Sequence, residues 1–209
     1  AAETAGEGGY TLDLDFHWSS DFLEYLPTLD VEFAHVSALQ FRHAQLRIDI
    51  SQFLSYFPKL KVLDLSENSL TALPRRVGHL HALETLDLGN NQLTLTAANV
   101  TELSRLTRLQ ILRLGANPML ARAPDVSAMA DLQTLDLHGT GITEWPTGLF
   151  TAPRPRAFDL DLQGNPIEQV PLVAPGSEQA RLIARTRLSR DRLSDQDREQ
   201  FHAYMPSVG

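Results

Sequence analysis

The residues best able to do chemistry in this chain are aspartates that recur at one position of a repeated pattern. They are Asp13, Asp64, Asp87, Asp136 and Asp161, and Arg113 stands at the equivalent position of one copy. Neighbouring positions add Arg42, His138 and Asp159. Arginine can clamp a carboxylate with two parallel hydrogen bonds, so these nine side chains suit the binding of a charged partner. Acid–base catalysis would need a buried pocket around a carboxyl group, which the pattern does not indicate.

Little else in the sequence suggests chemistry. His79 and His81 are two positions apart, but a metal site needs at least one further ligand, so we interpret them as solvated side chains. The chain has no cysteine, which removes disulfides, thiolate metal sites and a cysteine nucleophile. Phosphate-binding loops, nucleophile elbows and zinc-protease motifs are absent from the sequence. We expect no cofactor, no metal and no catalytic residue in this chain.

Charge and hydropathy narrow the class of partner. The net charge is −8, with −9 in residues 1–175 and +1 in residues 176–209. An acidic body repels phosphate backbones, so we expect no nucleic-acid partner. No apolar run approaches the roughly 18 residues that span a membrane, and the lack of cysteine favours the cytoplasm. The chain opens at Ala1 without a methionine, so we expect a fragment or a processed form.

A repeated pattern must position these side chains. The pattern L-x-x-L-x-L-x-x-N-x-L begins at residues 9, 36, 60, 83, 109, 132 and 157. Its fourth and sixth positions point to one side of a short strand and are nearly always leucine, so that side is the core. The third, fifth and seventh positions point outward. One such strand cannot bury its leucines alone, so the copies must stack and share a core.

The ninth position carries asparagine in most copies, where a buried amide can donate and accept hydrogen bonds at a turn. Asn68, Asn91, Asn117 and Asn165 should form a ladder that Ala44 and Thr140 interrupt. We expect the Thr140 hydroxyl to satisfy part of its turn, and the fold to be weakest near Ala44. Three return segments contain a proline and should be extended or single-turn. Apolar spacing predicts one short helix over residues 97–106.

The repeats resemble the leucine-rich-repeat family over residues 9–172. This resemblance implies an α/β solenoid, a horseshoe of about 6–7 repeats with a parallel β-sheet on its concave face. We divide the chain into an aromatic-rich N-terminal cap with a degenerate first repeat (1–35), leucine-rich repeats (36–175), and a C-terminal helical cap or linker to a missing domain (176–209). Aspartate is common between the strand leucines of this family, so the acidic column is either a binding surface or the family's usual composition.

Residues 180–185 and 195–198 are similar to the segment that follows the repeats in some proteobacterial toxin-like and type III effector proteins. In that group the repeats often select the substrate of a cysteine-dependent ubiquitin ligase. The resemblance implies a virulence module, cytoplasmic or secreted into the host cytoplasm, that binds a protein on its concave face. The acidic column favours a partner with a basic or mixed-charge surface, and we expect the chain to be a monomer. The alternative is the recognition arm of such a ligase, whose catalytic domain lies outside residues 1–209. A purely structural or self-regulatory role is a third possibility.

Overall fold

The computed structural model describes residues 2–5, 9–15, 23, 30–47 and 49–205, with no side-chain detail for residues 2–5. The aromatic-rich segment 16–30, expected to cap the N-terminal end, therefore lies almost entirely outside the described residues. Leu23 is described, and it packs against the core.

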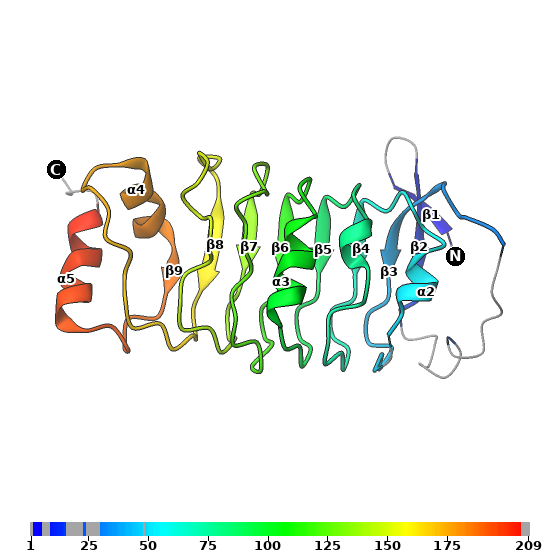
Figure 1. Cartoon of the computed structure of the whole chain (residues 1–209), viewed down its shortest axis with the longest axis horizontal. Coiled ribbons are helices and arrows are strands. Elements are labelled where there is room, and N and C mark those ends of the chain that lie inside the picture. The colour runs from blue at the N-terminus through cyan, green and yellow to red at the C-terminus, as the bar shows by residue number, and fades with distance from the viewer. Residues whose placement is uncertain (1, 6–8, 16–22, 24–29, 48, 206–209) are drawn as a thin grey trace.

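The described strands form one sheet that runs along the long axis of the molecule (Figure 1). Nine strands follow one another in chain order. Strand β1 is antiparallel to β2, and every later pair is parallel. Their bounds are β1 Ala2–Ala5, β2 Gly9–Asp13, β3 Val36–Gln40, β4 Val62–Asp64, β5 Thr85–Asp87, β6 Ile111–Arg113, β7 Thr134–Asp136, β8 Asp159–Leu162 and β9 Arg187–Leu188. This arrangement confirms the predicted open solenoid with a parallel sheet.

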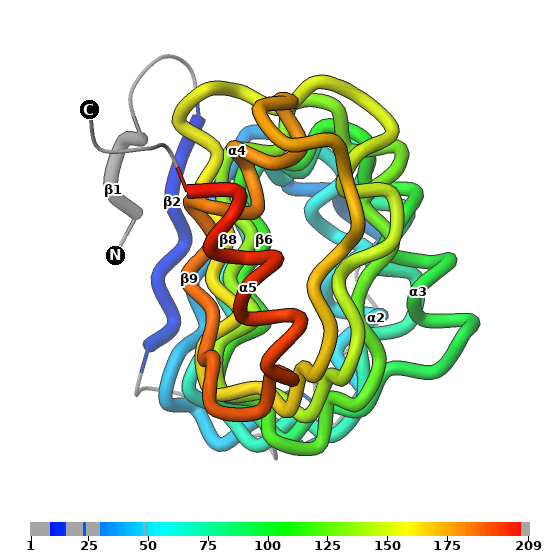
Figure 2. Tube along the Cα trace, turned by 90° about the vertical axis from the view of Figure 1, so that its left-hand side faces the viewer, coloured from blue at the N-terminus to red at the C-terminus, as the bar shows by residue number. Residues whose placement is uncertain are grey.

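The core lies between the sheet and the return segments, as the end-on view shows (Figure 2). The leucines at the fourth and sixth positions of β4 to β7 are completely buried. In each of these strands the two residues that flank the fourth-position leucine are half-exposed. The alternation that the sequence predicts is therefore present, and the outward residues form one continuous surface, the strand face.

The turns after strands β3 to β8 use a left-handed backbone, which the repeat pattern did not reveal. The residue just before the asparagine position has a positive φ in six consecutive copies: His43, Glu67, Asn90, Ala116, Gly139 and Gly164. This conformation costs an L-residue such as Ala116 (φ 54°) roughly 1–2 kcal/mol, whereas glycine adopts it readily. The turn geometry is thus imposed by the stacking of the repeats, even where the local residue disfavours it.

The asparagine ladder is confirmed, and it runs in one direction. Asn91 Oδ1 accepts the N–H of Leu70 from the preceding repeat at 3.0 Å, and Asn91 Nδ2 donates to the carbonyls of Leu65 and Leu88, also at 3.0 Å. Likewise, Asn117 Oδ1 accepts the Leu93 N–H, and Asn117 Nδ2 donates to the Leu88 carbonyl. Each asparagine therefore completes the turn of the repeat before it as well as its own.

This direction corrects the expectation at Ala44. The turn at Ala44 does not lack an acceptor, because Asn68 Oδ1 accepts the N–H groups of both Ala44 and Leu46. At Thr140 the expected partial substitution is present: the hydroxyl lies 3.2 Å from the Leu137 carbonyl and 2.6 Å from Asn165 Oδ1.

The return segments are mostly extended, as predicted from their prolines. Short parallel bridges join Ala72 to Thr94 and Asp125 to Thr147. Helical pieces occur at α2 (Ser51–Leu54), at the 3-10 turn η1 (Val77–His79) and at α3 (Ala97–Ser104), which confirms the predicted helix. Thr96 caps α3 through a reciprocal pair of bonds with Asn99. No helix in the described ranges is long and apolar enough to cross a membrane.

The C-terminal segment contains two helices and also continues the sheet. Ser177 caps the N-terminus of helix α4 (Glu178–Arg185), and Ser194 caps that of α5 (Asp195–Tyr204). Each serine side chain accepts an N–H of the first turn. The helical cap expected over residues 176–209 is present as two helices, but α4 ends at Arg185 and strand β9, which joins β8, lies between the two helices. Tyr204 ties α5 to the last return segment, since its hydroxyl accepts the Val173 N–H at 2.9 Å.

Candidate functional site

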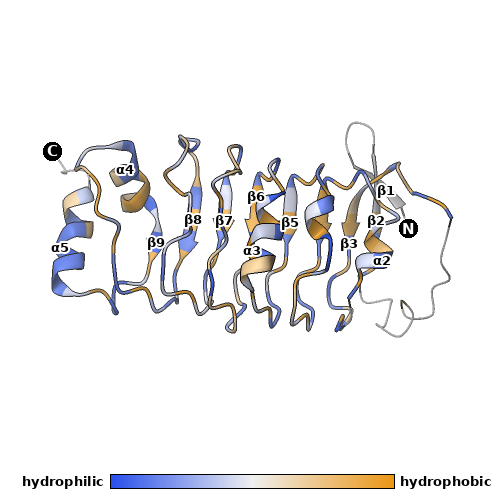
Figure 3. Cartoon of the chain, viewed as in Figure 1, coloured by the Kyte–Doolittle hydropathy of each residue, from blue (hydrophilic) through white to orange (hydrophobic). Residues whose placement is uncertain are grey.

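The fifth-position side chains form one column across the strand face, which we call the column. Arg42, His138 and Asp159 lie at the neighbouring positions beside it. Pairing places Asp64 opposite Asp87, then Arg113, Asp136 and Asp161 in turn. Asp13 lies opposite Gln40 at the N-terminal end, and Gln40 opposite Asp64. The ribbon changes from mostly hydrophobic at β3 to mostly hydrophilic at β8 and β9 (Figure 3). Charged side chains nevertheless occupy both halves of the column, from Asp13 and Asp64 to Asp136 and Asp161.

The column aspartates have a structural task that the sequence reasoning missed. Each accepts the backbone N–H two residues later, at 2.9–3.0 Å in all five cases: Asp13, Asp64, Asp87, Asp136 and Asp161. The last four have side chains only 14–23 % exposed, so they do not simply face solvent as expected. The aspartate at this position shapes the turn after each strand, which gives a physical reason for its recurrence.

Cationic side chains lie between these carboxylates, so the column is not a continuous run of unpaired negative charge. Arg42 Nη2 is 2.6 Å from Asp15, and its Nε is 3.7 Å from Asp64. Arg113 Nη1 is 3.4 Å from Asp87. Carboxylates outnumber guanidinium groups in the column, and Asp64 lies directly opposite Asp87, as Asp136 does opposite Asp161. Arg42 and Arg113 are 40 % and 43 % exposed, so both can contact a partner.

Asp87 is the carboxylate that the fold perturbs most clearly. Burial raises the pKa of Asp87, and repulsion from Asp64 raises it further. The Gly89 N–H and the Arg113 guanidinium act in the opposite direction. Ionised Asp87 is therefore held at a cost. A hydrogen bond and an ion pair with Asp15 instead raise the pKa of Arg42, which fixes that guanidinium in its charged form.

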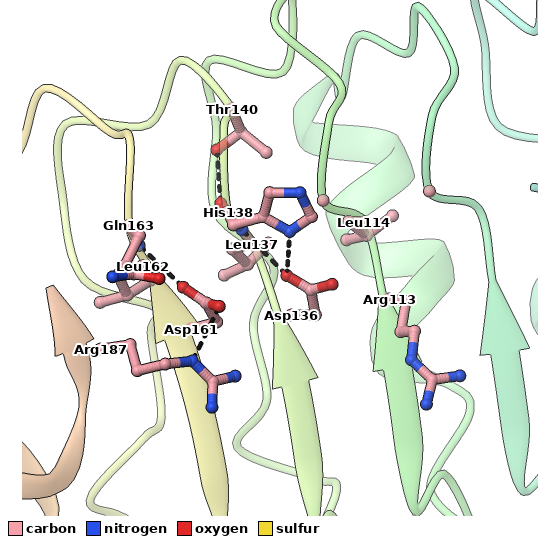
Figure 4. A network of polar contacts seen from close by, with 12 residues as sticks. Arg113, Leu114, Asp136, Leu137, His138, Thr140, Asp161, Leu162, Gln163 and Arg187 are labelled. Atoms are coloured by element: carbon pink, nitrogen blue, oxygen red, sulfur yellow. Dashed lines mark hydrogen bonds and ion pairs between the residues drawn. The ribbon is translucent and has the colours of Figure 1, made fainter. Parts of the chain in front are cut away.

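The C-terminal end of the column gathers four charged or ionisable groups (Figure 4). His138 Nδ1 lies 2.7 Å from Asp136 Oδ1, and Arg187 Nε lies 2.8 Å from Asp161 Oδ2. Gly115 makes room for the imidazole, because a Cβ at that position would lie 2.3 Å from His138 Nδ1. Ligand atoms of Asp136, His138 and Asp161 come within 4.8 Å of one another, a spacing that a metal ion could use. Internal contacts already account for this arrangement, because His138 lies against Asp136 and Arg187 pairs with Asp161.

Arg187 is a candidate site residue that sequence reasoning missed. It continues the column from Asp161 and also binds Asp159, with Nη1 2.9 Å from Oδ1. Hydrogen bonds to these two aspartates raise the pKa of Arg187. The signal was present in the sequence: Ile183, Thr186, Leu188 and Leu193 occupy the apolar positions of one further, degenerate copy of the pattern. Their burial confirms that this copy packs as a repeat.

Comparison with known proteins agrees with this geometry. The family model described as Leucine rich repeat matches residues 45–93 and 58–119. The matches lie within residues 45–119; together with the buried leucines and the asparagine ladder of the described repeats, they show the fold of a leucine-rich-repeat solenoid.

One curated protein and one solved structure illustrate how far the likeness extends. Human vasorin is 35 % identical over 94 residues, which are 44 % of this chain and 14 % of vasorin. The crystal structure of an internalin from Listeria monocytogenes aligns with 81 % of this chain and 44 % of that one, with a TM-score of 0.54 at 21 % identity. The chain thus spans a minor part of either protein, and the structural likeness is one of fold.

Proposed function

We propose that this chain binds another protein through its strand face. The observation that carries the proposal is that three arginines, Arg42, Arg113 and Arg187, lie among the column carboxylates. These guanidinium groups are 40–47 % exposed, and each is held by an aspartate of the same surface. They are therefore positioned before any partner arrives, and pre-positioned arginines at an open surface suit the carboxylates and carbonyls of a protein partner.

The partner proposed has a basic or mixed-charge surface. Seven carboxylates of the face (Asp13, Asp15, Asp64, Asp87, Asp136, Asp159 and Asp161) stand against three arginines, so the face stays net negative even though its members are paired. Opposite charge accelerates association and selects among partners more than it adds affinity. Strands at a spacing of about 4.8 Å present this pattern as a regular array that an extended protein surface can follow.

The biological setting that we favour is a bacterial effector or toxin, with this chain as its recognition domain. The alternative is the substrate-recognition arm of a cysteine-dependent ubiquitin ligase. The chain itself has no cysteine for a thioester. We expect a ubiquitin-chain assay with residues 1–209 alone to give no product, and a cysteine-bearing helical domain encoded after residue 209 would favour the alternative.

The test compares matched arginine pairs on opposite faces. Arg42→Gln with Arg113→Gln alters the strand face, and Arg75→Gln with Arg105→Gln alters the convex side; all four arginines make ion pairs in the parent chain. Each immobilised variant is exposed to host-cell lysate, and captured proteins are quantified against the parent chain. We expect the strand-face variant alone to lose a defined set of proteins, with association slowing as salt rises.

A charge-only variant sharpens the result. Replacing Asp64, Asp87 and Asp136 by lysine would also remove the bonds to the turn N–H groups, so asparagine is the better substitution because it keeps an Oδ1 acceptor. Loss of the same proteins with a preserved urea midpoint supports the strand face. If the convex variant loses them and the strand-face variants do not, the acidic column is only the usual composition of the repeat.

A further inference from the structure

A cavity of about 360 Å³ lies between the loop of residues 149–156 and helix α4, and four arginines line it: Arg154, Arg156, Arg181 and Arg185. We call it the arginine cavity. Glu178 is its single acidic lining residue. The lining comes from the loop and from α4, not from the strand face, so this site is separate from the surface proposed above.

The positive charge of the arginine cavity is not neutralised by the described part of the protein. On the strand face, Arg42, Arg113 and Arg187 pair with carboxylates. In the described residues none of the four cavity arginines is within ion-pair distance of an acidic group. Four guanidinium groups gathered around one cavity repel one another, and the chain as a whole has a surplus of acids that could have balanced them.

Arg154 shows that the arrangement is built rather than incidental. It is half-buried, and its Nη2 donates to the carbonyls of Val126 at 2.9 Å and Gly148 at 3.0 Å. Nη1 donates to the Met129 carbonyl, and the guanidinium carbon lies 5.8 Å from the centre of the Phe158 ring. Burial lowers the pKa of Arg154. Neutral carbonyls fix the side chain but leave its charge uncompensated, so a positive field is held at the cavity wall.

The remaining walls are apolar. Leu149, Phe150, Pro153 and Leu182 line the same cavity, and Leu149 and Leu182 are buried. Arg185 donates to the Arg156 carbonyl at 2.6 Å and so fastens the helix to the loop across the cavity. An enclosure of this size with apolar walls and a few convergent cations has the dimensions of a small-ligand site. The acidic body repels long polyanions, so the site suits a single anionic group.

We propose that the arginine cavity binds an oxyanion, a carboxylate or a phosphate, carried on an apolar group. Arginine recognises both anions through paired N–H donors, and the apolar walls take the attached group. Arg156 and Arg181 are exposed, and in the described protein their guanidinium groups make no hydrogen bond, so they are the residues available to the ligand. Arg154 and Arg185 hold the cavity in shape.

The test is an NMR titration of the 15N-labelled chain with phenyl phosphate, phenylacetate and benzylamine as probes. We expect saturable shifts at residues 149–156 and 178–185 with both anions, with a dissociation constant of about 1–10 mM for ligands of this size. Benzylamine should give none. Tighter binding of phenyl phosphate would point to a phosphate source, and tighter binding of phenylacetate to a carboxylate source.

Two double variants decide the assignment. Arg156→Gln with Arg181→Gln should weaken both anions about tenfold. The matched control is Arg47→Gln with Arg108→Gln, two exposed arginines that likewise have no ion pair, and it should leave the affinity unchanged. Thermal melts check that both variants are folded. The proposal is overturned if neither anion gives saturable shifts at the cavity, if benzylamine binds equally well, or if the cavity variant binds as tightly as the control.

Discussion

Replacing Asn91 by alanine tests whether the ladder stabilises the solenoid in the direction that we describe. Asn91 is buried, and its side chain makes four bonds: Oδ1 accepts from Leu70 N, and Nδ2 lies within bonding distance of the carbonyls of Leu65, Leu88 and Gly89. Alanine removes all four at once, yet the effects on the partner groups differ.

The magnitude follows from which partners keep another bond. Leu65 O still accepts from Asn68, Leu88 O from Asn117, and Gly89 O from the Glu67 N–H. Leu70 N alone is left without an acceptor in a buried site. A stranded buried donor costs about 1–3 kcal/mol. We therefore expect Asn91→Ala to lower the free energy of unfolding by about 2 kcal/mol, mainly through this one N–H.

Urea unfolding followed by circular dichroism measures the effect. With a slope of about 3 kcal/mol/M, 2 kcal/mol moves the midpoint down by about 0.7 M. Gln92→Ala removes an exposed amide one residue away and should stay within about 0.5 kcal/mol of the parent. Asn91→Thr returns a donor to the Leu88 carbonyl, as Thr140 shows for Leu137, but no acceptor to Leu70 N, so it should destabilise about as much as Asn91→Ala. Equal midpoints for Asn91→Ala and Gln92→Ala would refute the ladder argument.

Three further changes test other parts of the fold. Ala116→Gly relieves a left-handed residue and should raise stability by about 0.5–1 kcal/mol, whereas Gly139→Ala should lower it by about 1 kcal/mol; the same urea melts check both, and matching signs would contradict the strain. Because burial raises the pKa of Asp87, the stability that Asp87 contributes is present at low pH and is lost as pH rises through its folded-state pKa. Between pH 3 and pH 7, Asp87→Asn should therefore gain stability relative to the parent, by less than about 1 kcal/mol. Paired melts that show a relative loss over that range would disprove the argument. Tyr204→Phe removes the bond to Val173 and should cost about 1–2 kcal/mol, with thermal melts as the readout; an unchanged melting temperature would show that α5 does not depend on this anchor.

The fold was predictable because each repeat independently places leucines at the same strand positions. Leu63, Leu86 and Leu112 occupy equivalent positions and are all fully buried, so a local pattern was enough to assign strands and core. The column of the strand face followed from the same alternation. Degenerate copies weaken this argument, and β9 was missed because its two residues follow eight good helix formers.

Contacts between repeats were beyond sequence reasoning. Nothing in the residue type of Asn68 shows that it serves Ala44 in the preceding repeat, since that bond depends on the stacking offset. The pairing of Arg187 with Asp159 and Asp161 joins residues about one repeat apart in the chain, and it exists only because β9 is in the sheet. Side chains that act across repeats therefore had to be found in three dimensions.

The direction of the asparagine ladder gives the solenoid a polarity of assembly. A repeat lends its amide to the turn before it, so removing repeats from the N-terminal end leaves every remaining turn complete. Removal of repeats from the C-terminal end leaves the last remaining turn without the partner that the next repeat supplied. In the intact chain, Ser189 supplies such a partner, since it accepts the Gly164 N–H at 2.7 Å. In a linear array whose units hold only their neighbours, such asymmetry favours unzipping from the C-terminal side. Helix α5 covers that end of the molecule (Figure 2), and so protects the array at the end where unfolding would begin.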